Sequence, residues 1–282
     1  MKNFILYIEG DQGLLTLISL LKFTKNIIVV IPELYDCKDI EETSHENKLN
    51  LFVKKKKKIL DLSKYKPNII ISSQFPYKLS EKEYSIAKDF AVNIHASELP
   101  LYRGKNSDVW ALLNDERKIG ITIHKLDQDF DSGEILDIKY VNIDDSLNLN
   151  EIYKKVSSKI PEIIEEIYTE NILISKDLEK KDNIYWRART LSDSKIEWRM
   201  SARYVFLHIR ALSRDPIFAY SFSNNKKFTF LEVEVTDMLF LRIPGTVLFI
   251  KNVPHIVCGD NILIKVIKYK SEHTLKDKEI LH

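Results

Sequence analysis

The first hundred residues alternate between short apolar runs and stretches with helical periodicity, which limits the folds that this chain can adopt. Apolar runs of strand length cover 4–8, 27–31, 68–72 and 90–94, and a helix is predicted over 14–23. Strands that are apolar at nearly every position are buried on both faces, as in parallel sheets packed between other layers. The pattern therefore predicts an α/β domain with a doubly wound, mostly parallel sheet.

A change in sequence character near residue 185 predicts a domain boundary. From there the chain becomes polar and aromatic, and Ser201 is placed to cap a helix. Three β-like runs follow, separated by Gly and Pro turn signals, over 227–235, 245–250 and 262–267. We predict an α/β domain over 1–185 and a domain over 186–282 made of one helix and a small antiparallel barrel or sheet.

Charge and cysteine content argue against several classes of protein. Lys and Arg total 43 and Asp and Glu total 41, so the net charge of +2 gives no field that favours nucleic acid or a membrane surface. No apolar run reaches the roughly 18 residues of a membrane span, and no signal-peptide core follows Met1. Cys37 and Cys258 are too few for a disulfide framework or a CxxC metal site. We expect a reduced cytoplasmic protein that folds from Met1 and holds no metal.

Two other segments are interpreted as ordinary structure. The lysine run 54–58 could be a phosphate-binding patch, but a solvated helix face or loop explains it more simply. Apolar residues recur at helical spacing over 152–167, which predicts a core helix kinked at Pro161.

Two polar side chains lie at the end of the predicted strand 90–94. Asn93 and His95 alternate, so both side chains project from the same side of the strand, at the carboxyl end where open α/β sheets bind ligands. A second strand over 120–125 leads into a loop that contains three aspartates, and this loop reaches the same sheet edge if the strands are parallel.

An amide donor, an imidazole and a carboxylate at one place suit acyl transfer to an amine. Asn and His can donate hydrogen bonds to a developing oxyanion, and a carboxylate or a neutral imidazole can accept the proton of the amine. The spacing alone does not separate this chemistry from a chance Asn-x-His and an ordinary acidic loop.

The complete motif closely resembles that of the folate-dependent formyltransferase family. It consists of Asn93-x-His95-x-Ser97-x-x-Pro100-x-x-Arg103-Gly104, then Gly120-x-Thr122-x-His124, then Leu126-Asp127-x-x-x-Asp131-Ser132-Gly133. The resemblance implies a Rossmann-like fold and an enzyme that takes a formyl group from N10-formyltetrahydrofolate. It also implies that Asn93, His95 and Asp131 are catalytic. His124, although part of the motif, is interpreted as facing the sheet.

The resemblance also suggests binding residues. The loop after the strand 68–72 lines the folate pocket in this family, and the acidic loop closes its other side. The implied folate contacts are Gln74, Phe75, Pro76, Tyr77, Lys78, Leu79, Asp127 and Asp129. The predicted contacts to the acceptor substrate are Ser97, Arg103, Lys105, Arg210 and Tyr220.

The C-terminal sequence is similar to the smaller domain of methionyl-tRNA and amino-sugar formyltransferases, which the short purine-pathway enzymes lack. The residues that carry this similarity are Arg187-x-Arg189, Ile196-x-Trp198, Ile209-Arg210-Ala211-Leu212, Asp215-Pro216, Phe218-x-Tyr220 and Pro244-Gly245. Methionyl-tRNA formyltransferases typically have an Ala-Ala-Pro-like stretch after Arg-Gly, where this chain has Lys105-Asn106-Ser107. The chain also lacks a basic stripe suited to RNA.

We therefore expect the acceptor to be the amine of a dTDP- or UDP-linked amino deoxysugar used for surface polysaccharides. The enzyme is expected to be a homodimer with no membrane partner, as sugar-modifying relatives often are dimers. The alternatives are a methionyl-tRNA formyltransferase, a non-catalytic folate-binding member of the family, and a formyltetrahydrofolate hydrolase.

Overall fold

The computed structural model describes residues 2–173, 184–213 and 218–282, which form two compact units. The first comprises Met1–Gly104, Lys118–Asn142 and Lys154–Trp186. The second comprises Lys105–Arg117, Ile143–Tyr153 and Arg187–His282, so it takes in two segments that precede residue 185. Met1 and Asp215-Pro216 lie outside the described residues.

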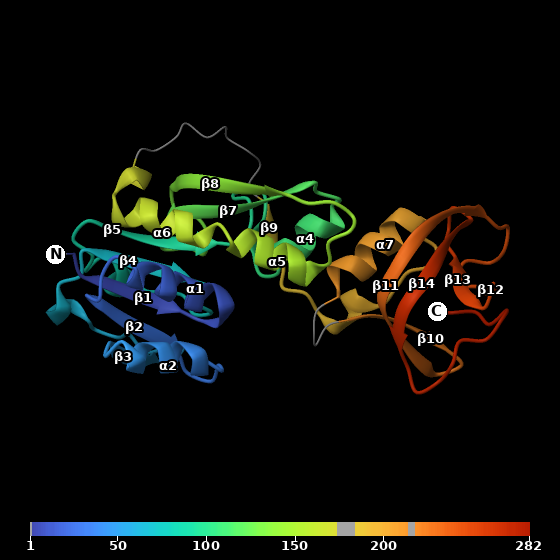
Figure 1. Cartoon of the computed structure of the whole chain (residues 1–282), viewed down its shortest axis with the longest axis horizontal. Helices are drawn as coiled ribbons and strands as arrows, with labels where there is room; N and C mark the ends of the chain where they lie inside the picture. Colours follow the sequence, from blue (N-terminus) through green and yellow to red (C-terminus); the bar gives the residue numbers. More distant parts are fainter. Residues whose placement is uncertain (1, 174–183, 214–217) are drawn as a thin grey trace. The chain divides into compact units, whose positions relative to one another are not determined.

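The first unit is built on a mostly parallel sheet (Figure 1). Its strands are, in spatial order, β3 (Asn50–Lys54), β2 (Ile27–Pro32), β1 (Phe4–Ile8), β4 (Ile69–Ser73), β5 (Phe90–His95), β7 (Lys118–Lys125) and β8 (Ile135–Asn142). The pairs from β3 to β5 are parallel, whereas β7 is antiparallel to both of its neighbours. A separate parallel pair joins β6 (Arg103–Gly104) to β9 (Tyr185–Trp186). The predicted fold class is confirmed.

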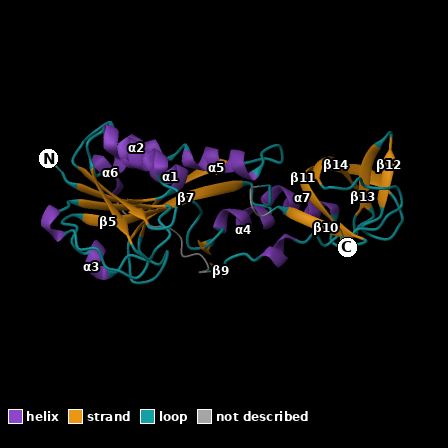
Figure 2. Ribbon diagram, turned by 90° about the horizontal axis from the view of Figure 1, so that it is seen from below, coloured by secondary structure: helices purple, strands orange, loops and turns teal. Residues whose placement is uncertain are grey.

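Both faces of this sheet are covered, as the uninterrupted burial of β1, β2 and β4 requires. Figure 2 shows α1 (Gly10–Leu21), α2 (Lys38–Glu46) and α6 (Ile160–Tyr168) along one face, and α3 (Glu81–Tyr84) toward the other. Short 3-10 helices η1 (Ser63–Tyr65) and η2 (Asn171–Leu173) also belong to this unit. The second face is covered largely by connecting segments, whose Leu62 and Leu79 pack against Ile5, Tyr7 and Ile70 of the sheet.

The strand order places a crossover next to β1, because β2 pairs on one side of β1 and β4 on the other. In open α/β sheets ligands bind at the carboxyl ends of the strands beside such a point. The segments that leave these ends here begin at Glu9 and at Gln74, and β5 ends nearby at His95.

Three local predictions are corrected. Residues 50–54 form the edge strand β3, and Lys54 is buried, so the lysine run is solvated only over 55–58. The predicted kinked helix is two helices, α5 (Leu149–Ser157) and α6, because Pro161 lies in the first turn of α6, where no N–H is needed. The first helix starts four residues earlier than predicted, at Gly10.

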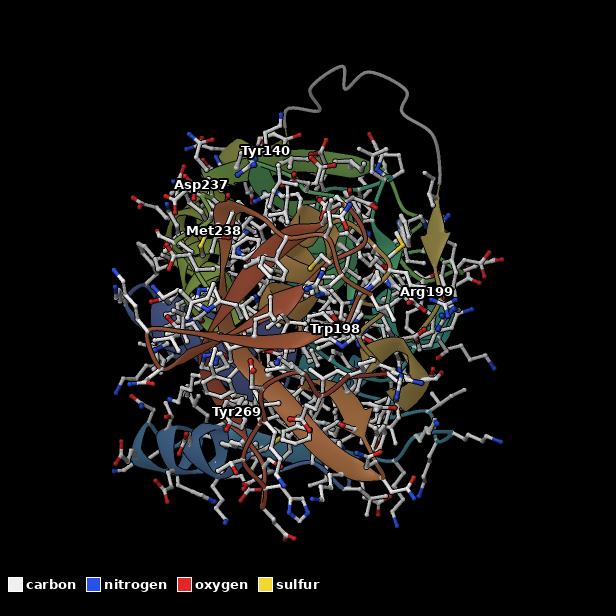
Figure 3. All side chains as sticks on the ribbon, turned by 90° about the vertical axis from the view of Figure 1, so that its right-hand side faces the viewer. Tyr140, Trp198, Arg199, Asp237, Met238 and Tyr269 are labelled. Atoms are coloured by element: carbon white, nitrogen blue, oxygen red, sulfur yellow. The ribbon has the colours of Figure 1, made fainter. Side chains whose placement is uncertain are left out.

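The second unit consists of helices and an antiparallel sheet. The helices are α4 (Ser107–Leu113), α7 (Ala202–Ala211) and the 3-10 helix η3 (Leu191–Ser194), and the sheet order is β10 (Ala219–Ser223), β11 (Lys226–Leu239), β14 (Ile262–Lys270), β13 (Val253–Val257) and β12 (Val247–Ile250). Ser201 caps α7 by accepting the Tyr204 N–H, as predicted. Trp198 lies edge-on to Phe230 in the core of this unit, and the ring of Tyr269 lies near the same phenylalanine. Trp198 and Tyr269 are labelled in Figure 3.

An ion-pair network explains why two early segments belong to the second unit. Arg203 of α7 donates to Asp145 at 2.6 Å and to Asp115 at 3.0 Å, and Arg117 donates to Asp145 at 3.0 Å. The network joins the ends of 105–117 and 143–153 to α7.

No helix in the described part of the chain is both long and apolar enough to cross a membrane.

Acid is expected to destabilise the second unit through His208. Burial, and to a lesser degree the nearby Arg189, lowers the pKa of His208 from 6.5 to about 4, although the Ser194 backbone and Asp193 oppose this. Between these two pH values the unfolded chain binds the additional proton, so the free energy of unfolding falls as pH drops from 6.5 to 4, by up to about 3 kcal/mol. Urea unfolding at several pH values measures this slope. His273→Leu, at an exposed site, is the control. If the free energy of unfolding depends on pH as steeply in His208→Leu as in the wild type and the control, His208 is not the group responsible.

Candidate active site

The predicted catalytic side chains come from β5 and from the loop between β7 and β8. Along β5, Val92 and Ile94 are buried, whereas Asn93 and His95 are partly exposed, as strand alternation requires. Nδ1 of His95 lies 3.5 Å from Oδ1 of Asp131, and both side chains are largely buried. The structure therefore brings the predicted imidazole and carboxylate together, next to Asn93 on the same strand.

The orientation of the His95 ring is set by a backbone carbonyl. Nε2 of His95 lies 3.0 Å from the carbonyl oxygen of Tyr102, which can only accept, so Nε2 carries a hydrogen. Nδ1 is then the nitrogen that faces Asp131. Ser97 is fully buried and donates to the same carbonyl at 2.8 Å, so it supports the loop that orients His95.

Backbone conformation and two hydrogen bonds hold Asp131 and its loop in place. It adopts a left-handed conformation with φ of 54°, and its Oδ2 accepts the Gly104 N–H at 3.2 Å. Arg103 donates to the neighbouring Phe130 carbonyl at 2.7 Å. Arg103 and Gly104 of the motif thus hold the loop that carries Asp131, and this stabilises the position of the Asp131 carboxylate.

The route by which Asp131 reaches the site differs from the expected one. The prediction assumed a parallel strand, but β7 runs antiparallel to β5, with Asn93 opposite His124 and His95 opposite Thr122. The end of β7 is therefore level with Val92, away from the carboxyl end of β5. The loop 126–134 turns back toward His95 before β8 begins, and this return brings Asp131 to the site.

His124, which sequence analysis left out, is part of this cluster. Its Nε2 lies 3.0 Å from Nδ2 of Asn93 and 3.7 Å from Oδ1 of Asp131. Burial and the neighbouring His95 lower the pKa of His124 to about 4, against the opposing effect of Asp131. Alternation in Thr122-x-His124 was visible in the sequence, but the antiparallel pairing that puts His124 opposite Asn93 was not.

Gly133 allows the loop to pass close to β7. A Cβ on Gly133 would lie 1.8 Å from the carbonyl oxygen of Lys125, the same oxygen to which His124 is bonded. We expect Gly133→Ala to displace Asp131 and lower kcat about tenfold or more, since small misplacements of catalytic groups have large effects. Steady-state kinetics with Ser132→Ala as the neighbouring control checks this, and equal kcat in both variants would contradict it.

The two predicted folate-binding loops lie together in the first unit. Nζ of Lys78 is 3.6 Å from Oδ1 of Asp129 in an exposed ion pair. Oε1 of Gln74 accepts the Gln12 N–H at 3.2 Å, so its side chain is fixed at the start of α1. Phe75 packs edge-on to Tyr7 and Tyr77, and Tyr77 donates to the Glu33 carbonyl.

The other members of these loops have varied surroundings. Leu79 is in the core, Pro76 is partly exposed, and Asp127 is exposed and accepts the Gln128 N–H at 2.6 Å. Phe130 is 48% exposed. The half-buried Phe75 and the exposed Phe130 suit contact with a flat aromatic ligand, so these loops fit a pterin in chemical type.

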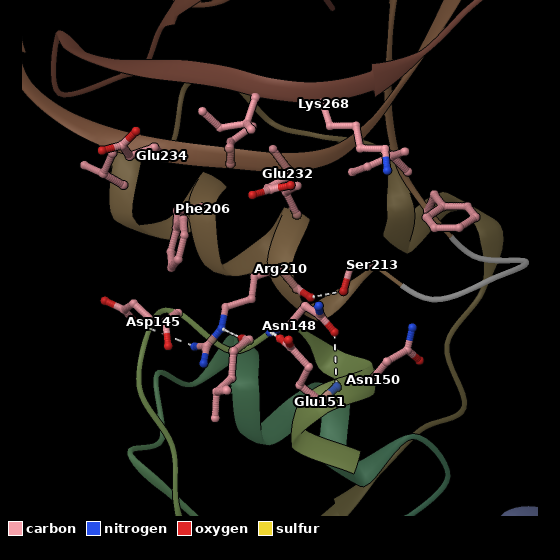
Figure 4. Close-up of a pocket in the computed structure, with 18 of the residues that line it drawn as sticks. Asp145, Asn148, Asn150, Glu151, Phe206, Arg210, Ser213, Glu232, Glu234 and Lys268 are labelled. Atoms are coloured by element: carbon pink, nitrogen blue, oxygen red, sulfur yellow. Dashed lines mark hydrogen bonds and ion pairs between the residues drawn. The ribbon is translucent and has the colours of Figure 1, made fainter. Parts of the chain in front are cut away.

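The remaining predicted acceptor contacts, Lys105, Arg210 and Tyr220, belong to the second unit. Lys105 is exposed, and Tyr220 is partly exposed with Nζ of Lys227 4.5 Å above its ring. Arg210 is buried and donates to the carbonyls of Asp144 and Leu147. It lines a hollow of about 790 Å³ between α7, the loop 145–151 and the sheet (Figure 4). Their role in substrate binding stays a prediction.

Family models match both parts of the sequence. The formyl transferase model matches residues 26–167, and the model of the formyl transferase C-terminal domain matches residues 190–282. The chain belongs to the formyl transferase family. The family predicted from the motif is thereby confirmed, and the motif from Asn93 to Gly133 lies within the region 26–167 that the first model matches.

Two solved structures share the fold of this formyl transferase over nearly their whole length. WlaRD, a sugar 3N-formyl transferase crystallised with dTDP and 5-N-formyl-THF, has 19% identity and a TM-score of 0.75 over 98% of this chain and 99% of that one. The N-formyltransferase from Helicobacter canadensis, in complex with folinic acid and dTDP-3-aminofucose, has 18% identity and a TM-score of 0.75 over 94% and 99%.

A curated relative is more similar in sequence but much longer. The bifunctional polymyxin resistance protein ArnA of Wigglesworthia glossinidia brevipalpis is 28% identical over an alignment of 258 positions that covers 86% of this formyl transferase. The chain spans 39% of the length of that relative.

Proposed function

We propose that this formyl transferase moves the formyl group of N10-formyltetrahydrofolate to the amine of a nucleotide-linked amino sugar. The observation that carries the proposal is the cluster of Asn93, His95 and Asp131 at the carboxyl end of β5, with His95 and Asp131 3.5 Å apart. The likeness to two sugar formyltransferases along nearly their full length supports the acceptor class. The dTDP or UDP carrier, the use in surface polysaccharides, the homodimer and the cytoplasmic location stay predictions.

The site residues divide the chemistry between them. Bound formyltetrahydrofolate would supply the formyl carbon, whose oxygen gains negative charge as an amine adds to it. Asn93 donates an N–H to that oxygen. Asp131 accepts the proton that the amine releases, and Nδ1 of His95 at 3.5 Å shares it. The positive charge that His95 then carries stabilises the same oxygen, because opposite charges attract strongly in a largely buried site. The bond between the formyl carbon and N10 would then break, and the proton held by the His95–Asp131 pair would pass to N10 of the leaving tetrahydrofolate.

The folate is expected to lie against the loops 74–79 and 126–130. Phe75 and Phe130 offer aromatic surface, and Lys78 and Asp129 join the two loops at one side. The acceptor amine then approaches from the side of Arg103 and Asp131.

A direct assay tests the proposal. The purified chain is incubated with N10-formyltetrahydrofolate and a panel of dTDP- and UDP-linked amino sugars, and mass spectrometry detects the formylated product. We expect product with at least one sugar and none with Asp131→Asn. Formylation of charged initiator tRNA instead, release of formate without an acceptor, or folate binding with no transfer would each support one of the alternatives and overturn the proposal.

A further inference from the structure

His124 is enclosed in the middle of the catalytic cluster. It lies on β7 opposite Asn93 and is 2% exposed. Its Nδ1 is 2.9 Å from the carbonyl oxygen of Lys125, and its Nε2 is 3.0 Å from Nδ2 of Asn93. Each ring nitrogen therefore has one hydrogen-bond partner, on opposite sides of the ring.

These partners select one tautomer of the imidazole. A backbone carbonyl can only accept, so Nδ1 of His124 carries the hydrogen and donates to Lys125. Burial keeps the ring neutral, with a pKa near 4. Nε2 then has a free electron pair, and it accepts an N–H from the amide of Asn93.

The accepted bond fixes the amide of Asn93. Nδ2 has to face His124, since Oδ1 in that place would meet the electron pair of Nε2. Among the described residues, neither Oδ1 nor the second N–H of Asn93 has a hydrogen-bond partner. One donor of Asn93 is thus used to hold the side chain, and the other is left for a ligand.

We propose that His124 is a positioning residue that acts through Asn93: as the Nδ1–H tautomer it orients the amide so that the second N–H is presented to the formyl oxygen. The inference rests on the proposed function for the identity of that oxygen. Asp131, 3.7 Å from Nε2, is the alternative partner that His124 would take if Nε2 carried the hydrogen, and Asn93 would then be released. The bond to Lys125 prevents this.

Two substitutions at His124 distinguish the contributions of its two ring nitrogens. His124→Asn keeps a donor near the place of Nδ1 and removes the acceptor for Asn93, whereas His124→Gln keeps an acceptor near the place of Nε2. We expect His124→Asn to lower kcat by about 10- to 100-fold with little change in KM, and His124→Gln to retain more of the activity. In the Asn93→Ala background, His124→Asn should change kcat less than about twofold, because the bond is already absent. His208→Leu controls for the loss of a buried imidazole elsewhere.

Equal losses in the Asn and Gln variants, or additive losses in the double variant, would overturn the proposal, because a purely structural role predicts both. Histidine ¹⁵N NMR reports the tautomer of His124 directly in the wild-type protein. It depends neither on activity nor on whether the His124 variants fold. We expect the neutral Nδ1–H tautomer for His124 in the wild type, with an Nε2 resonance that shifts in Asn93→Ala. An Nε2–H tautomer would refute the positioning role even in an active enzyme. The expected spectra in a chain that formylates no sugar would leave the positioning role in place and remove only the proposed function.

Discussion

Asn93→Ala is expected to lower kcat by two to three orders of magnitude while leaving the fold intact. The amide supplies the N–H that the proposal assigns to the formyl oxygen, and removal of a single oxyanion donor raises the activation barrier by about 3 to 4 kcal/mol in other acyl-transfer enzymes. Asn93 is only partly buried, and its hydrogen-bond partner within the described residues is His124, so the truncation leaves a single buried acceptor, Nε2 of His124, without its donor. Single-turnover kinetics with the best acceptor of the panel measures the effect on the chemical step.

The matched control is Asn68→Ala. Asn68 lies just before β4, outside the cluster. Its Oδ1 accepts the Asn3 N–H at 3.1 Å, and its Nδ2 donates to the exposed Asp89 at 3.0 Å. We expect this control to keep wild-type turnover. A kcat for Asn93→Ala within tenfold of the wild type, with the control unchanged, would remove Asn93 from the proposed chemistry.

The fold was predictable where burial is simple. The strands β1, β2 and β4 are apolar runs because both faces of the sheet are covered, and the sequence shows this directly. The edge strand β3 was missed because only one side of it is paired, and its pattern merges with the lysine run. Composition cannot separate such a strand from a solvated segment.

The site was predictable in its members but not in its construction. The motif identifies Asn93, His95 and Asp131, yet it does not show that β7 is antiparallel to β5, and that pairing is what adds His124 to the cluster. The carbonyl of Tyr102 and the N–H of Gly104, which orient His95 and Asp131, are backbone groups and do not depend on the chemistry of a side chain. Sequence patterns carry no information on such groups.

Lys54 shows the same limit for a side chain. In the sequence it is the first of five adjacent lysines, but in the structure it is 3% exposed and donates to Glu83 at 2.5 Å and to the Lys58 carbonyl at 2.7 Å. Its partner is 29 residues away on α3. Burial raises the pKa of Glu83, but the bonds from Lys54, Ser80 and the Leu60 N–H outweigh it and hold that pKa below its ordinary value.

Lys54→Met is therefore expected to destabilise the first unit by about 3 to 5 kcal/mol, since it leaves the Glu83 carboxylate buried without its cation. The same substitution at the exposed Lys56 should change the free energy of unfolding by less than about 0.5 kcal/mol. The double variant Lys54→Met with Glu83→Met removes both charges, and it should be more stable than Lys54→Met alone because an apolar pair can replace a buried ion pair. Urea unfolding of the four proteins measures these differences.

The ion pair also bears on the active site, because α3 follows directly after the loop 74–79. Glu83 accepts the Ser80 N–H at 3.0 Å and its hydroxyl at 2.9 Å, so the carboxylate caps α3 just after Leu79 and anchors the end of the predicted folate-binding loop to β3. Loss of Lys54 should therefore raise the KM for formyltetrahydrofolate more than it lowers kcat, since Asn93, His95 and Asp131 lie on other elements. An unfolding free energy equal to that of Lys56→Met would show that the pair is not buried in solution. A fall in kcat with an unchanged KM would show that the loop does not hold the folate.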